Sequence, residues 1–335
     1  MILLPVLALA LAALGTLWLA RPGNRLAARA IPDARSLHHR VTPSGGGLAV
    51  VVTLLIADLL LRFVIYPGEP YAGLLPHPNL LAALFLVAAI SWADDRRPLP
   101  PVLRLVVHAS AAFLAVDAGL APPLAVLLIV WSINLFNFMD GMDGLAGGMA
   151  VIGFGALGGF GFAGGADLFA LSALTVTGAF AGFLAWNFPP ARIFLGDVGS
   201  AALGLLAAVF GLWGVRDGLF APAVPLLIFA PFWVDATLTL LRRAARRERL
   251  WLPHCTHAYQ RLVRAGWSHR RTAMHEYALM LACVGAAAAY ARSGPLARGA
   301  ILAAAALAFC ALVMLVRRVE RAADGRTPPP QASQG

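Results

Sequence analysis

Lysine is absent from this chain of 335 residues, and charged residues of any kind are scarce. Asp, Glu, Lys and Arg together make up 13% of the residues, whereas 60% are hydrophobic and the mean hydropathy is +0.77. Soluble domains carry about a quarter of their residues as charged side chains, so the composition excludes that class. The three cysteines, Cys255, Cys283 and Cys310, are too few and too scattered for a disulfide framework or a cysteine-based zinc site.

The apolar residues form long blocks between short charged or Pro- and Gly-rich segments. Because about 20 helical residues cross a bilayer core about 30 Å thick, these blocks predict an all-α, polytopic integral membrane protein with about eleven transmembrane helices. We expect one transmembrane domain over residues 1–320 and a disordered tail over residues 321–335. The predicted spans lie near residues 2–20, 46–65, 79–93, 103–120, 122–138, 145–163, 168–187, 200–214, 219–241, 273–291 and 298–316.

All 26 basic residues are arginines, and the formal net charge is +10. In a soluble protein this charge would raise the question of nucleic acid, but here the placement of the arginines indicates membrane lipids and no nucleic acid. Assigning the loops alternately to the two faces leaves only Arg62, Arg216, Arg292 and Arg298 on one of them. The positive-inside rule then makes the other face cytoplasmic, with the N-terminus outside and the C-terminus inside. The predicted cytoplasmic loops are residues 21–45, 94–104, 187–199 and 242–272.

Carboxylates and histidines gather on this predicted cytoplasmic face. Asp94 and Asp95 stand side by side at the end of a span, which indicates a role with a cation or a proton, because adjacent like charges are costly unless something shares them. A solvated helix end paired with Arg96 and Arg97 is the simpler alternative.

A second polar segment runs from Asn134 and Asn137 to Asp140 and Asp143, followed by glycines. Side-chain oxygens that recur every third residue at a helix end can point toward one centre, and oxygen-only ligands suit Mg²⁺ or Mn²⁺. Two Asx turns that cap helices would explain both aspartates but not two asparagines inside an apolar run.

Two further segments precede apolar runs. Asp197 and Ser200 occupy the place of N-caps, where the amides and dipole of a helix favour an anionic ligand; simple helix capping is the alternative. Residues 45–47 are three glycines, whose amides either approach a phosphate closely or form a hinge at a helix start.

The loop over residues 242–272 contains His254, His257 and Arg261. Arginine forks bind phosphates bidentately, whereas a zinc site on the two histidines lacks further ligands at a suitable spacing. The arginine run over residues 242–249 is explained most simply as an anchor on anionic lipid. Asp235, within the ninth predicted span, is either a functional intramembrane carboxylate or a buried partner of Arg242 or Arg243.

In this order the segments resemble the polyprenyl-phosphate N-acetylhexosamine-1-phosphate transferases, glycosyltransferase family 4. The resemblance rests on the paired aspartates, Asn-x-x-Asn-x-x-Asp-Gly-x-Asp-Gly, Phe-x-Gly-Asp-x-Gly-Ser and His-x-x-His-Ala-Tyr-Gln-Arg, and it covers residues from about 30 to 275. It implies a Mg²⁺-dependent enzyme, with Mn²⁺ possible, that transfers a sugar-1-phosphate from a UDP-N-acetylhexosamine to undecaprenyl phosphate and releases UMP. The Arg-Ser-Leu-His segment is most similar to the branch that starts O-antigen or capsule glycans.

The resemblance also implies roles for individual residues. Asn137 and Asp197 would hold the metal, and a group of four carboxylates would be catalytic: Asp94 and Asp95 at the acceptor phosphate, Asp140 and Asp143 in the nucleotide-metal pocket. Arg104 stands where relatives often have lysine. The substrate-binding candidates are Arg35, His38, Arg104, Asn134, His254, His257 and Arg261.

The resemblance further places the protein in the bacterial cytoplasmic membrane, with the site facing the cytoplasm and a homodimer possible. Within the family, the alternative is a phospho-N-acetylmuramoyl-pentapeptide transferase of peptidoglycan synthesis. Outside it, an ion-coupled transporter would place charges near the bilayer midplane and show paired repeats, and a scaffold subunit would need no metal pocket. Among the UDP-sugars, no local rule in the sequence selects one donor.

Overall fold

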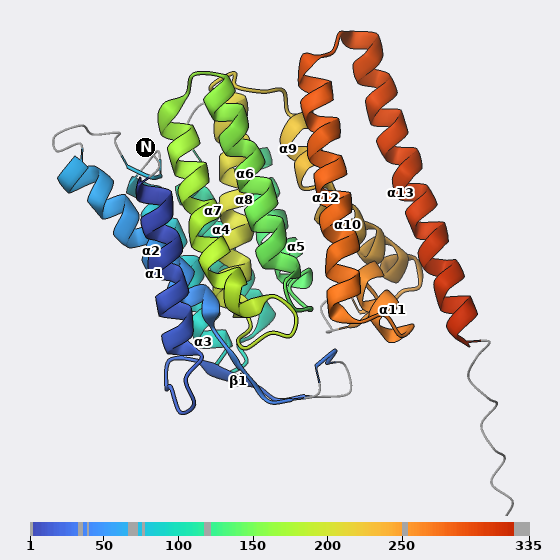
Figure 1. Ribbon diagram of the computed structural model, residues 1–335, viewed down its shortest axis with the longest axis horizontal. Coiled ribbons are helices and arrows are strands. Elements are labelled where there is room, and N and C mark those ends of the chain that lie inside the picture. Colours follow the sequence, from blue (N-terminus) through green and yellow to red (C-terminus); the bar gives the residue numbers. More distant parts are fainter. Residues whose placement is uncertain are drawn as a thin grey trace, which may run out of the picture.

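The structure is a computed structural model, and it describes residues 3–32, 36–38, 40–65, 73–75, 78–116, 122–249 and 254–324. Those residues form an almost wholly helical bundle, shown in Figure 1, with two short strands. The first half consists of α1 (Leu3–Leu19), β1 (Ala28–Ala30), β2 (Thr42–Ser44), α2 (Gly46–Leu60), the π-helical turn η1 (Leu61–Ile65), α3 (Pro78–Asp94), α4 (Pro101–Ala115), α5 (Pro122–Phe138) and α6 (Leu145–Ala163). The second half consists of α7 (Asp167–Asn187), α8 (Gly196–Arg216), α9 (Ala223–Ile228), α10 (Ala230–Ala245), α11 (Ala258–Arg264), α12 (His269–Arg292) and α13 (Pro295–Asp324).

Helix α8 lies at the centre of the bundle and packs against α5, α3 and α2. It is almost wholly buried, whereas α13 at the opposite extreme is almost wholly exposed. Its contact with α2 depends on small residues, because a Cβ on Gly47 would lie 2.2 Å from the Cα of Gly199. This close approach brings the starts of α2 and α8 together at one end of the bundle.

The remaining helices surround this centre. Helix α7 packs against α1 and α6, and α3 packs against α4. Helices α12 and α13 form an antiparallel pair at the edge of the bundle opposite α1 and α2 (Figure 1). The exposed apolar side chains of these outer helices face lipid when the bundle lies in a membrane.

The ninth predicted span, residues 219–241, is broken into two helices. The amide of Phe229 closes α9 on the carbonyl of Pro225 at 3.1 Å, and α10 begins at the next residue. Pro231 has no amide hydrogen and occupies the first turn of α10, where none is needed. The proline therefore starts a new helix inside what the sequence presents as one apolar block.

Length and apolarity indicate a membrane protein. In the described part of the chain six helices are long and apolar enough to cross a bilayer, namely Gly46–Ile65, Leu145–Ala163, Asp167–Asn187, Gly196–Arg216, His269–Arg292 and Pro295–Ala323. Four shorter apolar helices accompany them: Leu3–Leu19, Asn79–Asp94, Pro101–Ala115 and Pro123–Phe138. The all-α membrane class is therefore confirmed, while the count of eleven spans and the orientation stay predictions. Helix α13 also continues to Asp324, so the first residues of the predicted disordered tail are helical.

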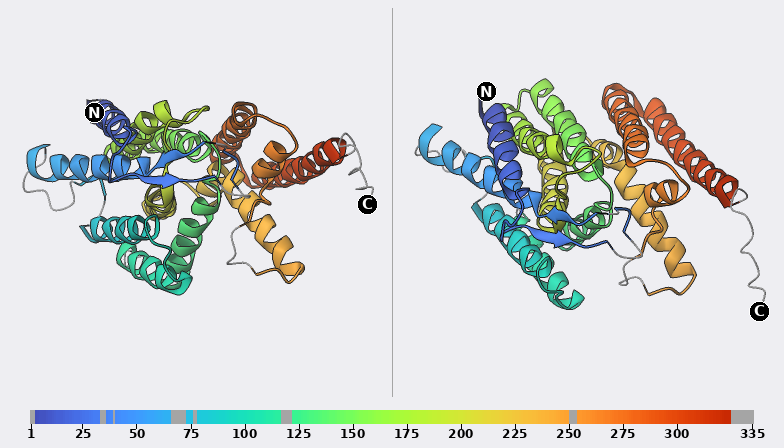
Figure 2. Two further views of the ribbon diagram at one scale, coloured as in Figure 1. Left: turned by 90° about the horizontal axis from the view of Figure 1, so that it is seen from below. Right: turned by 60° about the horizontal axis from the view of Figure 1, so that its bottom comes forward.

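The two strands lie across one end of the bundle (Figure 2). They pair antiparallel, with Ala28 opposite Ser44 and Ala30 opposite Thr42. Ser44 also pairs with Phe194 as an isolated parallel bridge. The strands thus tie the loop before α2 to the loop before α8, and both loops belong to the predicted cytoplasmic set.

Candidate active site

A cavity of about 360 Å³ opens at this end of the bundle. Four aspartates from three separate segments of the chain line it, so we call it the aspartate pocket. They are Asp95 after α3, Asp140 and Asp143 between α5 and α6, and Asp197 in the first turn of α8. Two predicted substrate-binding residues, His38 and His254, line the same pocket. The structure therefore brings together six of the thirteen predicted site residues around one space.

The first turn of α8 organises these carboxylates. The amide of Asp197 donates to Oδ1 of Asp95 at 3.4 Å, and the amide of Val198 also donates to this carboxylate. The carboxylate of Asp140 accepts from the amide of Gly196. The carboxylates that follow α3 and α5 thus accept hydrogen bonds from the free amides at the start of α8. These amides are therefore paired with side chains from other segments of the chain.

The capping interpretation of Asp197 and Ser200 is wrong. Residue Leu195 is the N-cap of α8 and has no side-chain cap hydrogen bond. Asp197 lies one residue inside the helix, where its side chain is free to face the pocket. The hydroxyl of Ser200 accepts a hydrogen bond from Nδ2 of Asn137 at 3.1 Å.

Gly196 makes the close grouping possible. Its φ is +75°, a backbone conformation that side chains disfavour, and a Cβ there would lie 2.9 Å from Oγ of Ser44 and 3.1 Å from Oδ2 of Asp95. Only glycine fits this position without moving β2 or the Asp95 carboxylate.

The carboxylates repel one another. Burial and the negative charge of Asp197 raise the pKa of Asp95 to about 7. Burial, together with the charges of Asp197 and Asp95, also raises the pKa of Asp140 well above its ordinary value. Carboxylates held this close in a partly buried pocket are relieved by a shared proton or by a compensating cation.

A network of hydrogen bonds holds the side chain of Asp197. The side chain of Asn137, on the last turn of α5, hydrogen-bonds Asp197, and Asp94 also lies within hydrogen-bonding reach of it. Asp94 is held in turn by Nη1 of Arg104 at 2.7 Å and by the amide of Leu99 at 2.7 Å. Of the predicted pair, Asp95 faces the pocket and Asp94 lies behind it.

The donor set fits a hard divalent cation bound by few protein ligands. The pocket wall offers carboxylate oxygens from Asp95, Asp140 and Asp197, and the thiol of Cys255 also lines it. Asn137 is not on the wall, but its side chain hydrogen-bonds Asp197. In the part of the chain that the structure describes, no three His, Cys, Asp or Glu side chains form a ready-made cage. Mg²⁺ commonly uses one or two carboxylates and takes its other ligands from water and substrate phosphates, so this set suits it.

Asp143 has a partner that sequence reasoning missed. Nδ1 of His269, in the first turn of α12, lies 3.2 Å from Oδ2 of Asp143, and the amide of Ala191 donates to the same oxygen at 3.0 Å. Burial alone would raise the pKa of Asp143, but these hydrogen bonds lower it below its ordinary value. Nε2 of His269 also contacts the carbonyl of Leu37 at 3.1 Å. The available signal was a histidine in the predicted cytoplasmic loop 242–272, shortly before an apolar block.

Asn187 is a second residue that sequence reasoning missed. Its Oδ1 accepts from the amide of Gly144 at 2.9 Å, and its Nδ2 donates to the carbonyl of Ile193 at 2.9 Å. It is the last residue of α7 and lines the aspartate pocket. The signal for it was a polar residue at the end of an apolar helix, on the predicted cytoplasmic face.

The glycine segment before α2 is built into the fold. The amides of Gly45 and Gly46 donate to the carbonyl of Phe194 at 3.1 and 2.9 Å, and the amide of Gly47 donates to that of Leu195 at 2.8 Å. These three amides therefore dock the α2 loop onto the α8 loop, which favours the structural interpretation over phosphate binding. The same docking places the ring of His38 edge-on to Phe194, with ring centroids 4.9 Å apart.

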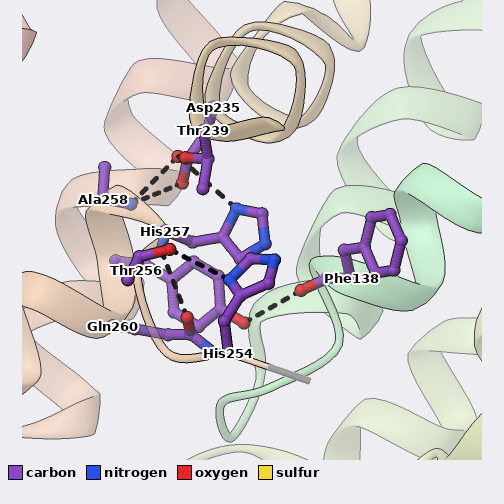
Figure 3. A network of polar contacts seen from close by, with 9 residues as sticks. Phe138, Asp235, Thr239, His254, Thr256, His257, Ala258 and Gln260 are labelled. Atoms are coloured by element: carbon purple, nitrogen blue, oxygen red, sulfur yellow. Dashed lines mark hydrogen bonds and ion pairs between the residues drawn. The ribbon is translucent and has the colours of Figure 1, made fainter. Parts of the chain in front are cut away.

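The two predicted histidines of the long loop lie differently (Figure 3). His254 lines the pocket, and burial, His257 and Arg243 lower its pKa to about 4, so its imidazole is neutral at neutral pH. His257 is buried, and its Nδ1 lies 3.7 Å from Oδ1 of Asp235. His254 is thus available to a ligand, and His257 belongs to the support beneath it.

Asp235 holds the start of α11 (Figure 3). Both of its oxygens accept from the amide of Ala258 at 2.9 Å, and Oδ1 also accepts from Oγ1 of Thr239 at 3.1 Å. Arg243 instead donates to Glu248 at 2.8 Å. Asp235 is therefore a positioning residue for the loop that presents His254 and His257.

The remaining predicted residues are not on the pocket wall. Nδ2 of Asn134 bonds the carbonyl of Val130 in its own helix at 2.7 Å. Arg104 binds Asp94, and Arg261 forms an ion pair with Glu320 of α13 and lines a different cavity. Arg35 lies outside the described residues.

Comparisons with known proteins identify the family of the chain. The model of the family "Glycosyl transferase family 4" matches residues 77–215, a segment that contains all the predicted aspartates of the pocket. A Bacillus subtilis (strain 168) protein named as an undecaprenyl-phosphate N-acetylglucosaminyl 1-phosphate transferase is 29% identical, over 73% of this chain and 72% of that protein.

Two further relatives lie in different branches. The decaprenyl-phosphate N-acetylglucosaminephosphotransferase of Mycobacterium leprae is 30% identical, over 76% of this chain and 74% of that protein. The phospho-N-acetylmuramoyl-pentapeptide-transferase of Chloroflexus aurantiacus is 28% identical, over 68% of this chain and 70% of that protein. The chain therefore belongs to glycosyltransferase family 4.

Proposed function

We propose that the protein transfers a sugar-1-phosphate from a UDP-N-acetylhexosamine to undecaprenyl phosphate, giving undecaprenyl-diphosphate-sugar and UMP. The observation that carries the proposal is the convergence of four aspartates from three segments of the chain on one pocket at an end of the helix bundle. They are Asp95, Asp140, Asp143 and Asp197. Membership of family 4 and relatives named for N-acetylglucosamine-1-phosphate transfer to polyprenyl phosphates support it. The sugar is expected to start an O-antigen or capsule glycan.

The reaction joins two anions. Attack of a phosphomonoester on the diphosphate of a nucleotide sugar is accelerated chiefly by positioning and by neutralisation of the developing charge. Asp197 and Asn137 are proposed to hold Mg²⁺, with Mn²⁺ as the alternative, and the bound ion would neutralise charge on the diphosphate. Without a cation the pocket would repel both substrates.

The chain's own residues then have separate tasks. Asp95 faces the pocket and is proposed to receive the proton of the acceptor phosphate. Asp94, paired with Arg104, holds the side chain of Asp197 in place. His254 is neutral and offers a hydrogen bond to the donor without adding charge. Asp143, fixed by His269, sets the position of the α5–α6 loop that carries Asp140.

The location of the pocket suits the two substrates. The acceptor keeps its polyprenyl tail in the bilayer, whereas the UDP-sugar is water-soluble, so the two meet at a membrane surface. We propose that the pocket opens on the cytoplasmic side of the bacterial inner membrane, as the arginine distribution predicts. The homodimer expected from the family resemblance stays a prediction.

The test is a membrane assay with labelled UDP-N-acetylhexosamines, undecaprenyl phosphate and Mg²⁺, which measures UMP release and solvent-extractable sugar. We expect product with at least one donor and none in EDTA. Absence of product with every donor would refute the transferase, and equal product in EDTA would refute the metal. UDP-N-acetylmuramoyl-pentapeptide belongs in the donor panel, because product with it alone would favour the peptidoglycan branch represented by the Chloroflexus relative.

A further inference from the structure

A second cavity, of about 650 Å³, lies between the ends of α10, α11 and α13. Seven arginines and two glutamates line it, and no aspartate of the described chain does, so we call it the arginine pocket. Among the described residues, Cys255 is the one that lines both this cavity and the aspartate pocket. The two cavities are therefore neighbours with different walls and opposite charge.

The arginines outnumber their acidic partners. Arg243 pairs with Glu248, and Arg261 pairs with Glu320. Among the residues that the structure describes, none of the other five forms an ion pair with a carboxylate: Arg242, Arg246, Arg264, Arg317 and Arg321. The cavity thus holds positive charge that its own glutamates do not balance.

These charges lie close enough to disfavour one another. The guanidinium of Arg242 is repelled by Arg261, Arg317 and Arg246, and Asp235 offsets this repulsion only in part. Partly buried like charges are held together at a cost unless an anion joins them. Arginine forks from several directions suit a phosphate, which each of them can bind with two parallel hydrogen bonds.

A third cavity, of about 310 Å³, continues from the arginine pocket between α10, α12 and α13. It is lined mostly by apolar side chains such as Leu238, Leu279 and Phe309. Arg242 and Arg261 line both cavities. A cationic space and an apolar space therefore meet at two shared arginines, which is the arrangement that an amphiphile requires.

Helix α13 gives such a molecule direct access from the bilayer. It forms one wall of both cavities, and nearly all of its surface is exposed. Its apolar residues face lipid when the bundle is in a membrane, and Arg317 and Arg321 follow them at the helix end. Basic pockets between transmembrane helices commonly bind the head groups of anionic lipids.

We propose that these two cavities together bind an anionic glycerophospholipid, with its phosphodiester head group in the arginine pocket and an acyl chain in the apolar cavity. The site is separate from the chemistry of the aspartate pocket and is independent of which sugar is transferred. The lipid would contact Arg261, which lies in α11, and Asp235 of α10, whose carboxylate accepts from the amide of Ala258 at the start of α11. Helix α11 follows His254 and His257 in the chain.

The test uses the full chain in detergent and native mass spectrometry with added phosphatidylglycerol. The double variant Arg317→Gln/Arg321→Gln is expected to bind this lipid roughly thirtyfold more weakly than the unchanged protein, at about fivefold per arginine. The double variant Arg292→Gln/Arg298→Gln, at the opposite ends of α12 and α13, is the matched control and should bind normally. Arg317→Lys/Arg321→Lys keeps the charge and should retain most of the binding.

Three outcomes would overturn the proposal. One is that the Arg317→Gln/Arg321→Gln variant binds phosphatidylglycerol as tightly as the Arg292→Gln/Arg298→Gln control. Another is that the protein binds zwitterionic phosphatidylcholine as tightly as phosphatidylglycerol. The third is displacement by undecaprenyl phosphate at equal concentration, which would make the cavities an acceptor site. Deacylated glycerophosphoglycerol distinguishes a lipid from a free phosphate: it should bind far more weakly, and binding as tight as the lipid's would refute a role for the acyl chain. Melting temperatures of all variants establish that they are folded.

Discussion

The aspartate pocket and the arginine pocket are neighbours, yet they attract ions of opposite sign. Four aspartates line the first, and seven arginines line the second. The net charge of +10 conceals this separation. An acidic pocket requires a cation before any phosphate can enter, whereas a basic pocket binds phosphate directly. The comparison teaches that the sum of charges on a membrane protein's face says little about the ligand of any one cavity.

The strongest test of the acidic side is Asp197→Asn. We expect activity to fall about 10²–10³-fold, because the variant removes, without changing shape, a charged oxygen that is proposed to bind the cation. The measurement is UMP release at several Mg²⁺ concentrations. Asp217→Asn, at the other end of α8, is the matched control and should keep nearly full activity. A fully active Asp197→Asn enzyme with unchanged Mg²⁺ dependence would refute the claim that the aspartate pocket, unlike the arginine pocket, needs a cation.

Asp235 lines the apolar cavity next to the arginine pocket, and Asp235→Asn should lower kcat about tenfold. Its two carboxylate oxygens share the single amide hydrogen of Ala258 in a bifurcated hydrogen bond, and a hydrogen bond to a charged group contributes about 1.5–3 kcal/mol. The change should displace the loop that carries His254 while leaving the bundle folded. Steady-state kinetics and melting curves check this. Asp167→Asn, in the first turn of α7, is the control, and an equal loss there would show that the effect is general.

Gly196→Ala tests whether the carboxylates need their close grouping. Gly196 and Gly218 have similar positive φ values, of +75° and +71°. A Cβ at Gly196 would crowd Ser44 and Asp95, whereas one at Gly218 would meet nothing within 4 Å. We expect Gly218→Ala to cost about 1 kcal/mol through backbone strain alone, and Gly196→Ala to cost more and to lower activity severalfold. Equal melting temperatures and activities would contradict this.

The smallest expected effect concerns acid stability. The pKa of Asp143 is lower in the folded protein than its ordinary value, so its contribution to stability is complete above the unfolded pKa of about 3.9. It is lost as the pH falls further, through the folded pKa. His269→Gln should therefore reduce the melting temperature at neutral pH and flatten its decline below about pH 4. His275→Gln, on the same helix, should leave both unchanged.

The sequence predicted the membrane class and the acidic site because both depend on local patterns. Long apolar blocks predict helices. Asp95 and Asp140 follow such blocks and Asp197 precedes one, all on one predicted face. The comparisons confirm the family, while the roles of individual residues stay predictions. Assigning successive loops to alternate faces placed these aspartates on one side of the membrane. It did not indicate that Asp95 and Asp140 bind the first turn of α8.

Other features depend on contacts between distant segments. His269 and Asn187 act on loops far away in the chain, and no spacing rule connects them to Asp143 or Gly144. Arg261 matches a family motif, but its direction is set by Glu320 on α13. The break at Phe229 was hidden because Pro231 suits the start of a helix as well as the interior of an apolar block. Tertiary packing decided each of these cases.

The start of α8 has a further consequence for inhibition. Helix starts often capture free phosphate or sulfate through their amides, but here Asp95 and Asp140 already take the amides of Gly196, Asp197 and Val198. Inorganic phosphate should therefore compete poorly with substrate in the absence of a divalent ion. Pyrophosphate offered together with the metal should compete well, because the ion supplies the attraction that the occupied amides no longer provide.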